Sequence, residues 1–370
     1  MQNTPQNFVP RSDDAQAAPS LDLFCRVVDN YGDIGVCWRL ARQLSAEFGW
    51  RVRLIADDLR AFQWIAPDIA PSLPEQRLAG IDVLLWSDNL NLQPADVVIE
   101  AFACDPPANY VRAMSNKAIK PIWINLEYLS AEAWVDGVHG LPSPHRQLPL
   151  LKHFFVPGFT EQSGGLIRER DISVVAQPSA DDTVSTATQR VFVFAYPHAP
   201  IAALARALDG ESSSLSPQFD LASPVAAALP ESIQVKPISP VPQTKFDALL
   251  ARYALLIVRG EDSFLRAQWA SKPMLWHIYP TDDGAHIVKL NAWLDRYCVG
   301  MDAPTERAYR RASLAFNQSD ADSAKYVDFV QRLPVLAQHA IHWRRTLLLQ
   351  DDLATRLVRF VCLAEKPKIG

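Results

Sequence analysis

The sequence has few cysteines, and their spacing excludes two kinds of stabilised fold. Only five occur in 370 residues: Cys25, Cys37, Cys104, Cys298 and Cys362. No two of them form a C-x-x-C pair, so neither a disulfide framework nor a zinc site is indicated. We therefore expect reduced thiols and a cytoplasmic protein.

Long apolar runs and clusters of basic residues are also missing. No segment approaches the roughly 20 apolar residues that span a bilayer, and no Lys/Arg run is present in a chain of net charge -5. These absences argue against a membrane protein and against sequence-independent binding of nucleic acid. The polar residues 1–20 lack the apolar core of a signal peptide, and we expect them to form a disordered extension.

Apolar, strand-like segments alternate with helix-length segments along most of the chain. Strands are predicted at residues 21–28, 51–56, 81–86, 96–102, 121–128 and 152–159, and again at 190–196, 232–238, 253–261 and 272–280. This alternation predicts an α/β fold with parallel sheets covered on both faces. The Gly, Ser, Thr and Asp-rich residues 163–190 suit a domain boundary. We predict an N-terminal domain at 21–175 and a C-terminal domain at 176–370 that ends in helices, with ligands bound in the crevice between them.

No phosphate-binding glycine pattern of the G-x-G-x-x-G or Walker type follows the first predicted strand. Instead, "VVDNYGDIGVCW" places Asp29 and Asp33 between that strand and a predicted helix. Carboxylates repel phosphate, but at the carboxyl end of a strand facing a cleft they can act as general bases. The alternative is structural: Asp29 ends the strand, and Asp33 caps the helix that Ile34 opens.

A second strand-to-helix junction, "IVRGEDSF", occupies residues 257–264 in the other half. Gly260 permits an unusual backbone angle, and Asp262 or Ser263 can start the helix. Free backbone N–H groups at a helix start bind a pyrophosphate, and the Ser263 hydroxyl adds a donor. Glu261 and Asp262 would then face ribose hydroxyls or the transferred group. A simple capped turn is the structural alternative.

Aromatic, amide and acidic side chains near other strand ends complete the candidates. Phe246 offers a flat wall and Gln243 an amide partner for a pyrimidine base, although most aromatic residues in strands belong to the core. Glu100, Asp105 and Glu127 stand at the ends of first-half strands, where they could line a cleft for an acceptor.

Six long strings carry a resemblance to a known family: "FCRVVDNYGDIGVCWRLARQL", "VVIEAFACDPP", "INLEYLSAE", "GFTEQSGGLIRERD", "VPQTKFD" and "RGEDSFLRAQWASKPMLWHIYP". They closely resemble the EarP family, bacterial protein-arginine rhamnosyltransferases that modify elongation factor P. The resemblance implies a GT-B glycosyltransferase with two facing Rossmann-like domains. It also implies dTDP-β-L-rhamnose as donor in the C-terminal domain and elongation factor P held mainly by the N-terminal one. Transfer to arginine would be inverting, with no metal or other cofactor.

The resemblance also assigns roles to individual residues. It implies that Asp33 is the catalytic base, that Asp29 is an acid beside it, and that Glu261 takes part in catalysis. It places the nucleotide sugar around Tyr196, Gln243, Phe246, Arg259, Gly260, Asp262 and Ser263. Pro240 departs from the family, in which an aromatic residue before V-P-Q is expected, so this side of the base site has a smaller apolar face.

Transfer to arginine requires a base, because a guanidinium has a pKa above about 12 and, when protonated, no free lone pair. We expect Asp33 to accept the proton while Asp29 holds the guanidinium or the loop. A GT-B enzyme with a different nucleotide-sugar donor or a small-molecule acceptor is the nearer alternative. An aspartate-nucleophile phosphatase would need a second Asp where Tyr31 stands. Neither it nor a non-catalytic binding module explains both acidic junctions.

Overall fold

The computed structural model contains two α/β halves and describes residues 18–28, 31–87, 90–172, 190–211, 217–224 and 229–364. Asp29, most of the predicted N-terminal extension and the centre of the predicted linker lie outside these ranges. Within them, no helix combines the length and apolar character that crossing a membrane requires. Cys25, Cys37, Cys104 and Cys298 are buried free thiols, and Cys362 is exposed.

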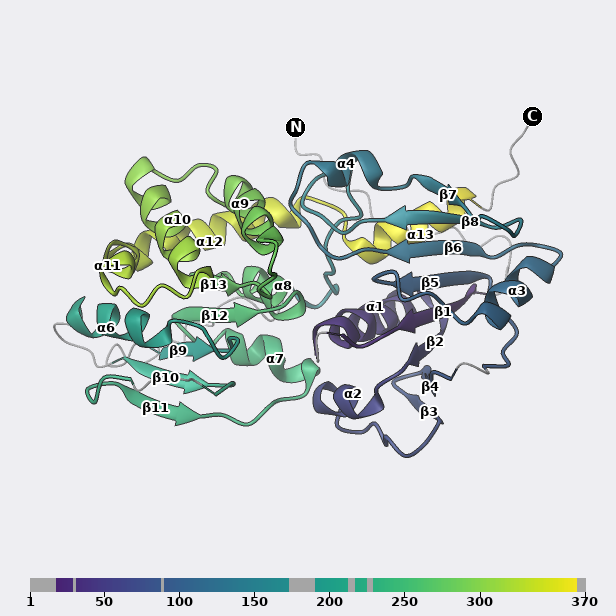
Figure 1. The fold of residues 1–370 in the computed structure, drawn as a ribbon, viewed down its shortest axis with the longest axis horizontal. Helices are drawn as coiled ribbons and strands as arrows, with labels where there is room; N and C mark the ends of the chain where they lie inside the picture. Colours follow the sequence, from purple (N-terminus) through teal and green to yellow (C-terminus); the bar gives the residue numbers. More distant parts are fainter. Residues whose placement is uncertain are drawn as a thin grey trace.

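The first half is built on an eight-stranded sheet (Figure 1). In spatial order its strands are β3 (Glu75–Leu78), β4 (Ile81–Leu85), β2 (Arg51–Ala56), β1 (Ser20–Cys25), β5 (Val97–Ala101), β6 (Ile122–Leu126), β8 (Leu151–Phe155) and β7 (Pro142–Pro144). The edge strands β3 and β7 run antiparallel to their neighbours, and the other strands are parallel. Its helices are α1 (Gly32–Phe48), α2 (Leu59–Ile65), α3 (Ala108–Asn116) and α4 (Trp134–Val138).

The second half is built on a five-stranded parallel sheet. In spatial order its strands are β11 (Gln234–Pro237), β10 (Gln218–Leu221), β9 (Arg190–Val193), β12 (Leu255–Arg259) and β13 (Met274–His277). The connecting helices are α6 (Ile201–Glu211), α7 (Gln243–Leu250) and α8 (Asp262–Trp269). The chain then continues through α9 (Ala285–Tyr297), α10 (Ala303–Asn317), α11 (Ala324–Gln331), α12 (Leu333–Leu348) and α13 (Leu353–Ala364).

The predicted α/β fold is confirmed, and each predicted apolar run contains a parallel strand. The central strands are buried on both faces, which is why they are continuously apolar, whereas the edge strand β11 is exposed along its length. The sequence pattern does not predict β3, β7 or β10. β3 is the polar edge segment EQRL, β7 is the edge segment PSP, and β10 places a buried Asp220 beside its buried Phe219.

Both sheets change the direction of strand order beside their first strand. In the first sheet, β2 and β4 lie on one side of β1, and the later strands β5 and β6 lie on the other. In the second sheet, β10 and β11 lie on one side of β9, and β12 and β13 lie on the other. Ligands of such sheets bind at the carboxyl ends of the strands, next to this reversal. The arrowheads of the two sheets point toward each other in Figure 1, and the helices α1 and α8, which follow β1 and β12, contact each other between the halves.

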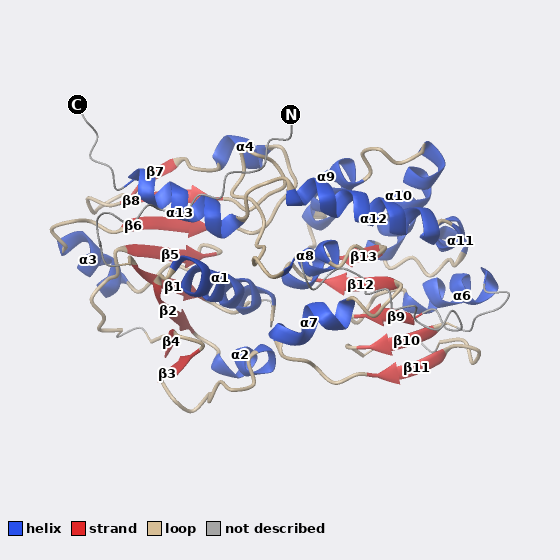
Figure 2. Cartoon of the chain, turned by 180° about the vertical axis from the view of Figure 1, so that it is seen from behind, coloured by secondary structure: helices blue, strands red, loops and turns tan. Residues whose placement is uncertain are grey.

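The last helix returns to the first half of the molecule. Phe360 of α13 packs edge-on against His153 and Phe155 of β8, with ring centroids 5.3 and 5.9 Å away. Arg356 donates hydrogen bonds to three carbonyl oxygens in the loop 160–163. Figure 2 shows α13 beside α1, so this helix covers the first sheet although it follows the second in sequence. The predicted boundary near residue 175 stays a prediction.

Gly165 provides a test of how tightly this returning segment is held. Its φ is +76°, and a β-carbon there would lie 2.9 Å from the carbonyl oxygen of Asp351. Gly140 is a matched control, because its φ is +80° but nothing lies within 4 Å of an added β-carbon. We expect Gly140→Ala to cost about 1–2 kcal/mol of unfolding free energy for backbone strain alone. Gly165→Ala should cost about 1–3 kcal/mol more, because the added methyl also overpacks the contact.

Urea denaturation followed by circular dichroism measures both losses. If both variants lost the same free energy of unfolding, the close packing of Gly165 against Asp351 would be contradicted.

Candidate active site

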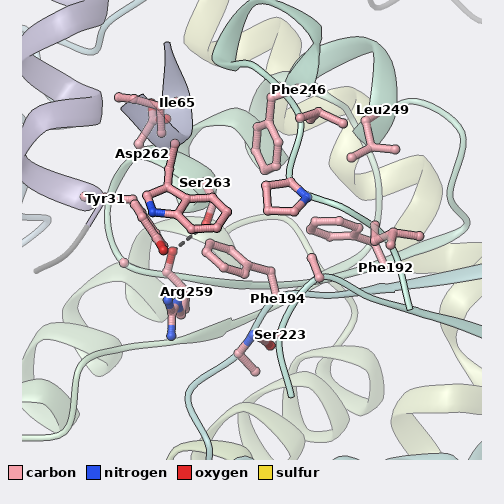
Figure 3. A pocket seen from close by; sticks show the side chains of 18 of the residues that line it. Tyr31, Ile65, Phe192, Phe194, Ser223, Phe246, Leu249, Arg259, Asp262 and Ser263 are labelled. Atoms are coloured by element: carbon pink, nitrogen blue, oxygen red, sulfur yellow. Dashed lines mark hydrogen bonds between the residues drawn. The ribbon is translucent and has the colours of Figure 1, made fainter. Parts of the chain in front are cut away.

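A cavity of about 280 Å³ lies between the two halves. The second half lines it with residues from 192–197, 222–224, 238–249 and 259–263, which follow or approach the carboxyl ends of β9, β10, β11 and β12. The first half contributes Tyr31, Gly32, Trp64 and Ile65. Figure 3 shows Phe192, Phe246 and Leu249 on one side of the cavity and Tyr31 and Ile65 on the other. The cavity therefore occupies the crevice that the sheet topology favours for a ligand.

Six of the seven predicted nucleotide-sugar residues line this cavity: Gln243, Phe246, Arg259, Gly260, Asp262 and Ser263. Tyr196 does not line the cavity, but its ring contacts Arg259, which does. The guanidinium carbon of Arg259 lies 4.7 Å from the Tyr196 ring centroid and 4.5 Å from that of Phe194. Two aromatic faces thus hold a cation at the edge of the cavity.

His277 helps to hold Tyr196 in place. Its Nδ1 accepts a hydrogen bond from the backbone N–H of Tyr196 at 3.2 Å. Burial and the nearby Arg259 lower the pKa of His277 to about 4. The ring is therefore neutral at physiological pH and can serve as this acceptor.

Helix α8 begins at the cavity without a side-chain cap. It starts at Asp262, as predicted, and the preceding Glu261 makes no capping hydrogen bond. The Ser263 hydroxyl instead donates back to the carbonyl oxygen of Arg259, and Gly260 takes a φ of 64°. Since uncapped N–H groups at a helix start carry partial positive charge, this end of the cavity suits an anionic group such as a diphosphate.

Asp33 lies in the first turn of α1, which begins at Gly32. Its side chain is 2% exposed, and its Oδ2 accepts a hydrogen bond from the backbone N–H of Val28 at 2.8 Å. The alternative in which Asp33 caps a helix opened by Ile34 is therefore wrong, because the helix starts one residue before Asp33 and its carboxylate bonds back to the preceding loop.

Tyr128 lies just after β6 and is not among the site residues predicted from the sequence. Its phenol lies near the Asp33 carboxylate. Burial and the Asp33 charge raise the pKa of the phenol far above its usual value, so it stays protonated. The ring stacks on Phe102 at a centroid distance of 4.2 Å, and the Lys289 ammonium lies 5.8 Å from the Tyr128 ring centroid. An aromatic residue directly after a strand that ends at the cleft was the available signal.

Glu261 approaches the same loop from the second half. Its Oε2 accepts a hydrogen bond from the backbone N–H of Leu129 at 2.9 Å. Burial raises the pKa of Glu261 to about 7, although Lys289 and the Leu129 N–H act in the opposite direction. Repulsion from Asp33 contributes to the rise. Residues 128 and 129 therefore lie beside the two predicted catalytic carboxylates, one from each half.

A buried ionic network links α1 to α8. Arg39 of α1 donates to Asp262 at 2.5 Å and to Glu169 at 3.2 Å. Arg266 of α8 donates to Asp247 and to Glu169, each at 2.6 Å. Burial alone would raise the pKa of Glu169, but the two arginines outweigh it and lower that pKa to about 2. The sequence offered one signal for this network, namely a charged Arg39 on the apolar face of its helix.

Gln243 adds a further contact across the cleft. Its Nε2 donates to the carbonyl oxygen of Gly35 at 2.8 Å and lies 3.3 Å from the Asp262 carboxylate. A β-carbon on Gly35 would stand 3.4 Å from that carboxylate, so a glycine permits the close approach. Gln243 and Asp262 thus hold the first half, and their contact with a nucleotide stays a prediction.

The acids proposed for an acceptor cleft have different surroundings. Glu100 is fully buried and pairs with Lys152 of β8 at 2.5 Å, so it supports the sheet and does not line a cleft. Glu127 accepts a hydrogen bond from Asn125 at 2.6 Å. Asp105 is exposed and has a φ of 49°.

Two facing α/β halves with a ligand-sized cavity between them define a GT-B fold, which confirms the predicted fold class. A solved spinosyn rhamnosyltransferase has the same fold, with a TM-score of 0.55 over 93% of this chain and all of its own at 12% identity. At that identity the similarity shows the fold alone.

Closer relatives define the family. A profile described as "Elongation-Factor P (EF-P) rhamnosyltransferase EarP" matches residues 21–362. A protein-arginine rhamnosyltransferase of Pseudomonas putida is 43% identical over 92% of this chain and 97% of its own. The structure solved for EarP-mediated arginine glycosylation of translation elongation factor EF-P has a TM-score of 0.58 at 29% identity, covering 94% of this chain and 99% of its own. The chain belongs to the EarP family.

Arg39 tests the importance of the ionic network. Arg39→Met should lower the free energy of unfolding by about 3 kcal/mol or more, because carboxylates remain buried without their cation. Arg77→Met is the control. Arg77 and Asp82 form a 3.2 Å surface pair with side chains 70% and 41% exposed, and its loss should cost under about 1 kcal/mol. Urea denaturation measures the unfolding free energy of both variants. Similar losses in the two would contradict a large contribution of the buried network to stability.

The raised pKa of Glu261 predicts a pH dependence of stability. Between its unfolded pKa of about 4.5 and its folded value of about 7, the folded protein binds the extra proton. This contribution is fully present at lower pH and is lost as pH rises through that window. Glu261→Gln should therefore gain stability relative to the wild type between pH 5 and pH 8. Parallel stability curves in urea titrations at several pH values would contradict the shift.

Proposed function

We propose that this protein transfers L-rhamnose from dTDP-β-L-rhamnose to an arginine side chain of elongation factor P, with inversion at the anomeric carbon. The observation that carries the proposal is the meeting of Asp33 and Glu261, from opposite halves, at residues 128 and 129 beside an uncapped helix start. Membership of the EarP family supports elongation factor P as the acceptor and rhamnose as the transferred sugar. A translation factor as acceptor places the activity in the cytoplasm.

The donor would bind in the cavity between the halves, against the wall that the second half provides. The diphosphate faces the α8 start and Arg259, whose position is fixed by Phe194 and Tyr196. The thymine lies against the apolar wall that includes Phe246. Because helix N–H groups and a guanidinium compensate the charge that develops on departing dTDP, the transfer needs no metal ion and no other cofactor.

The acceptor guanidinium would enter between Asp33 and the anomeric carbon. As the nitrogen forms its bond to that carbon, the bond from the carbon to the phosphate oxygen breaks and Asp33 takes the proton from the nitrogen. A single displacement of this kind inverts the configuration. Asp29, outside the described residues, would pair with the guanidinium. Tyr128, whose phenol lies near Asp33, would orient that carboxylate by a hydrogen bond.

Glu261 serves the donor side of the same centre. With a pKa of about 7, it holds a proton for much of the time at neutral pH. It can then donate a hydrogen bond to a sugar or phosphate oxygen without adding negative charge beside the leaving group.

The direct test mixes the protein with purified elongation factor P and dTDP-β-L-rhamnose. Intact-protein mass spectrometry should detect one added deoxyhexose, and a factor whose acceptor arginine is replaced by lysine should remain unmodified. Other nucleotide sugars, offered in parallel, test the alternative of a different donor. No mass gain with folded protein would overturn the proposal.

Asp33→Asn separates catalysis from donor binding. Turnover should fall by at least about 100-fold, because the amide cannot accept the proton. The affinity for dTDP, measured by isothermal titration calorimetry, should stay close to that of the wild type, since Asp33 is not among the residues that line the cavity. Wild-type turnover in this variant would assign the base elsewhere.

A further inference from the structure

Trp64 is a large aromatic residue of the first half whose side chain is 55% exposed, yet it lines the cavity. Its helix α2 is firmly placed. Asp58 caps the helix by accepting hydrogen bonds from the N–H groups of Arg60 and Ala61 at 2.9 and 3.0 Å. Phe62 is fully buried and packs edge-on against Trp38 of α1, with centroids 5.1 Å apart.

The helix turns the indole away from this anchor. At about 100° per residue, Trp64 points roughly 200° around the helix from Phe62. Its aromatic neighbour is Tyr31, with centroids 6.4 Å apart and rings inclined at 63°. Since Tyr31 also lines the cavity, the first half provides a pair of aromatic groups on this side of the cavity.

The opposite wall has a gap in its aromatic surface. Phe192, Phe194 and Phe246 line that wall, but its 238–241 segment presents Ile238, Ser239, Pro240 and Val241. A nucleotide resting on the second half would therefore meet an aliphatic segment there and would turn its other face toward α2. An uncharged indole covers such a face without repelling a diphosphate.

We propose that Trp64 is a donor-binding residue, which packs over the bound thymidine diphosphate from the acceptor half and closes the cavity. This inference rests on the proposed function, because the ligand is the donor nucleotide named there. It extends the predicted donor site, which lay wholly in the second half, across the cleft. Donor binding then stabilises the closed arrangement of the two halves, since one ligand contacts both.

The test titrates dTDP into the wild type and three variants by isothermal titration calorimetry. Trp64→Ala should weaken binding by about tenfold, and Trp64→Phe, which keeps an aromatic face, by no more than about threefold. Trp134→Ala is the matched control, because Trp134 is 44% exposed but does not line the cavity; its affinity should equal that of the wild type. Addition of dTDP should also quench tryptophan fluorescence in the wild type more than in Trp64→Phe.

The possible failures are distinguishable. A folded wild type that does not bind dTDP would overturn the proposed donor, and the role of Trp64 with it. Wild-type binding that is unchanged in Trp64→Ala would overturn the role of Trp64 alone. An unchanged affinity for dTDP with a raised KM for elongation factor P would assign Trp64 to the acceptor and equally overturn the inference.

Discussion

The pairing of two buried arginines with acids from both halves is the constraint on which the site depends. The side chains of Arg39 and Arg266 are 2% and 1% exposed, so each buried charge needs carboxylates beside it to offset the cost of losing water. Asp262 of α8 meets Arg39 of α1 only while the two helices lie against each other. Separating the two halves would break this pair and also the pair between Arg266 and Glu169. The network thus sets the distance between the starts of α1 and α8, and hence between Asp33 and Glu261.

The same network explains how two adjacent acids can stand where a diphosphate is expected. Asp262 faces Arg39, which balances its charge. Glu261, one residue earlier, has no cation in direct contact among the described residues and accepts a backbone N–H, and burial raises its pKa to about 7. One acid is therefore neutralised by an ion pair and the other by partial protonation. The partial positive charge of the helix start is left available for phosphate.

The fold and part of the candidate site could be predicted from local sequence patterns. Strands buried on both faces are visible as continuous apolar runs, and the segments that follow them contain Asp33 and residues 259–263. What could not be predicted depends on contacts between distant segments. Arg39 and Asp262 are 223 positions apart, so their pairing requires the assembled halves. Trp64 stands on an unremarkable short helix, and its place at the cavity follows from how α2 packs on α1.

The Gln243 side chain can link the contact between the two halves to donor binding, because its amide has both a hydrogen-bond donor and an acceptor. Its Nε2 donates to the Gly35 carbonyl oxygen, whereas its Oε1 is buried and finds no donor within the part of the chain that the structure describes. A buried acceptor without a partner costs about 1–3 kcal/mol. In the proposed complex the N–H of a thymine can supply the missing donor while Nε2 stays on Gly35. The donor and the first half would then be held by the same side chain at once, so that binding the nucleotide favours closing the cleft.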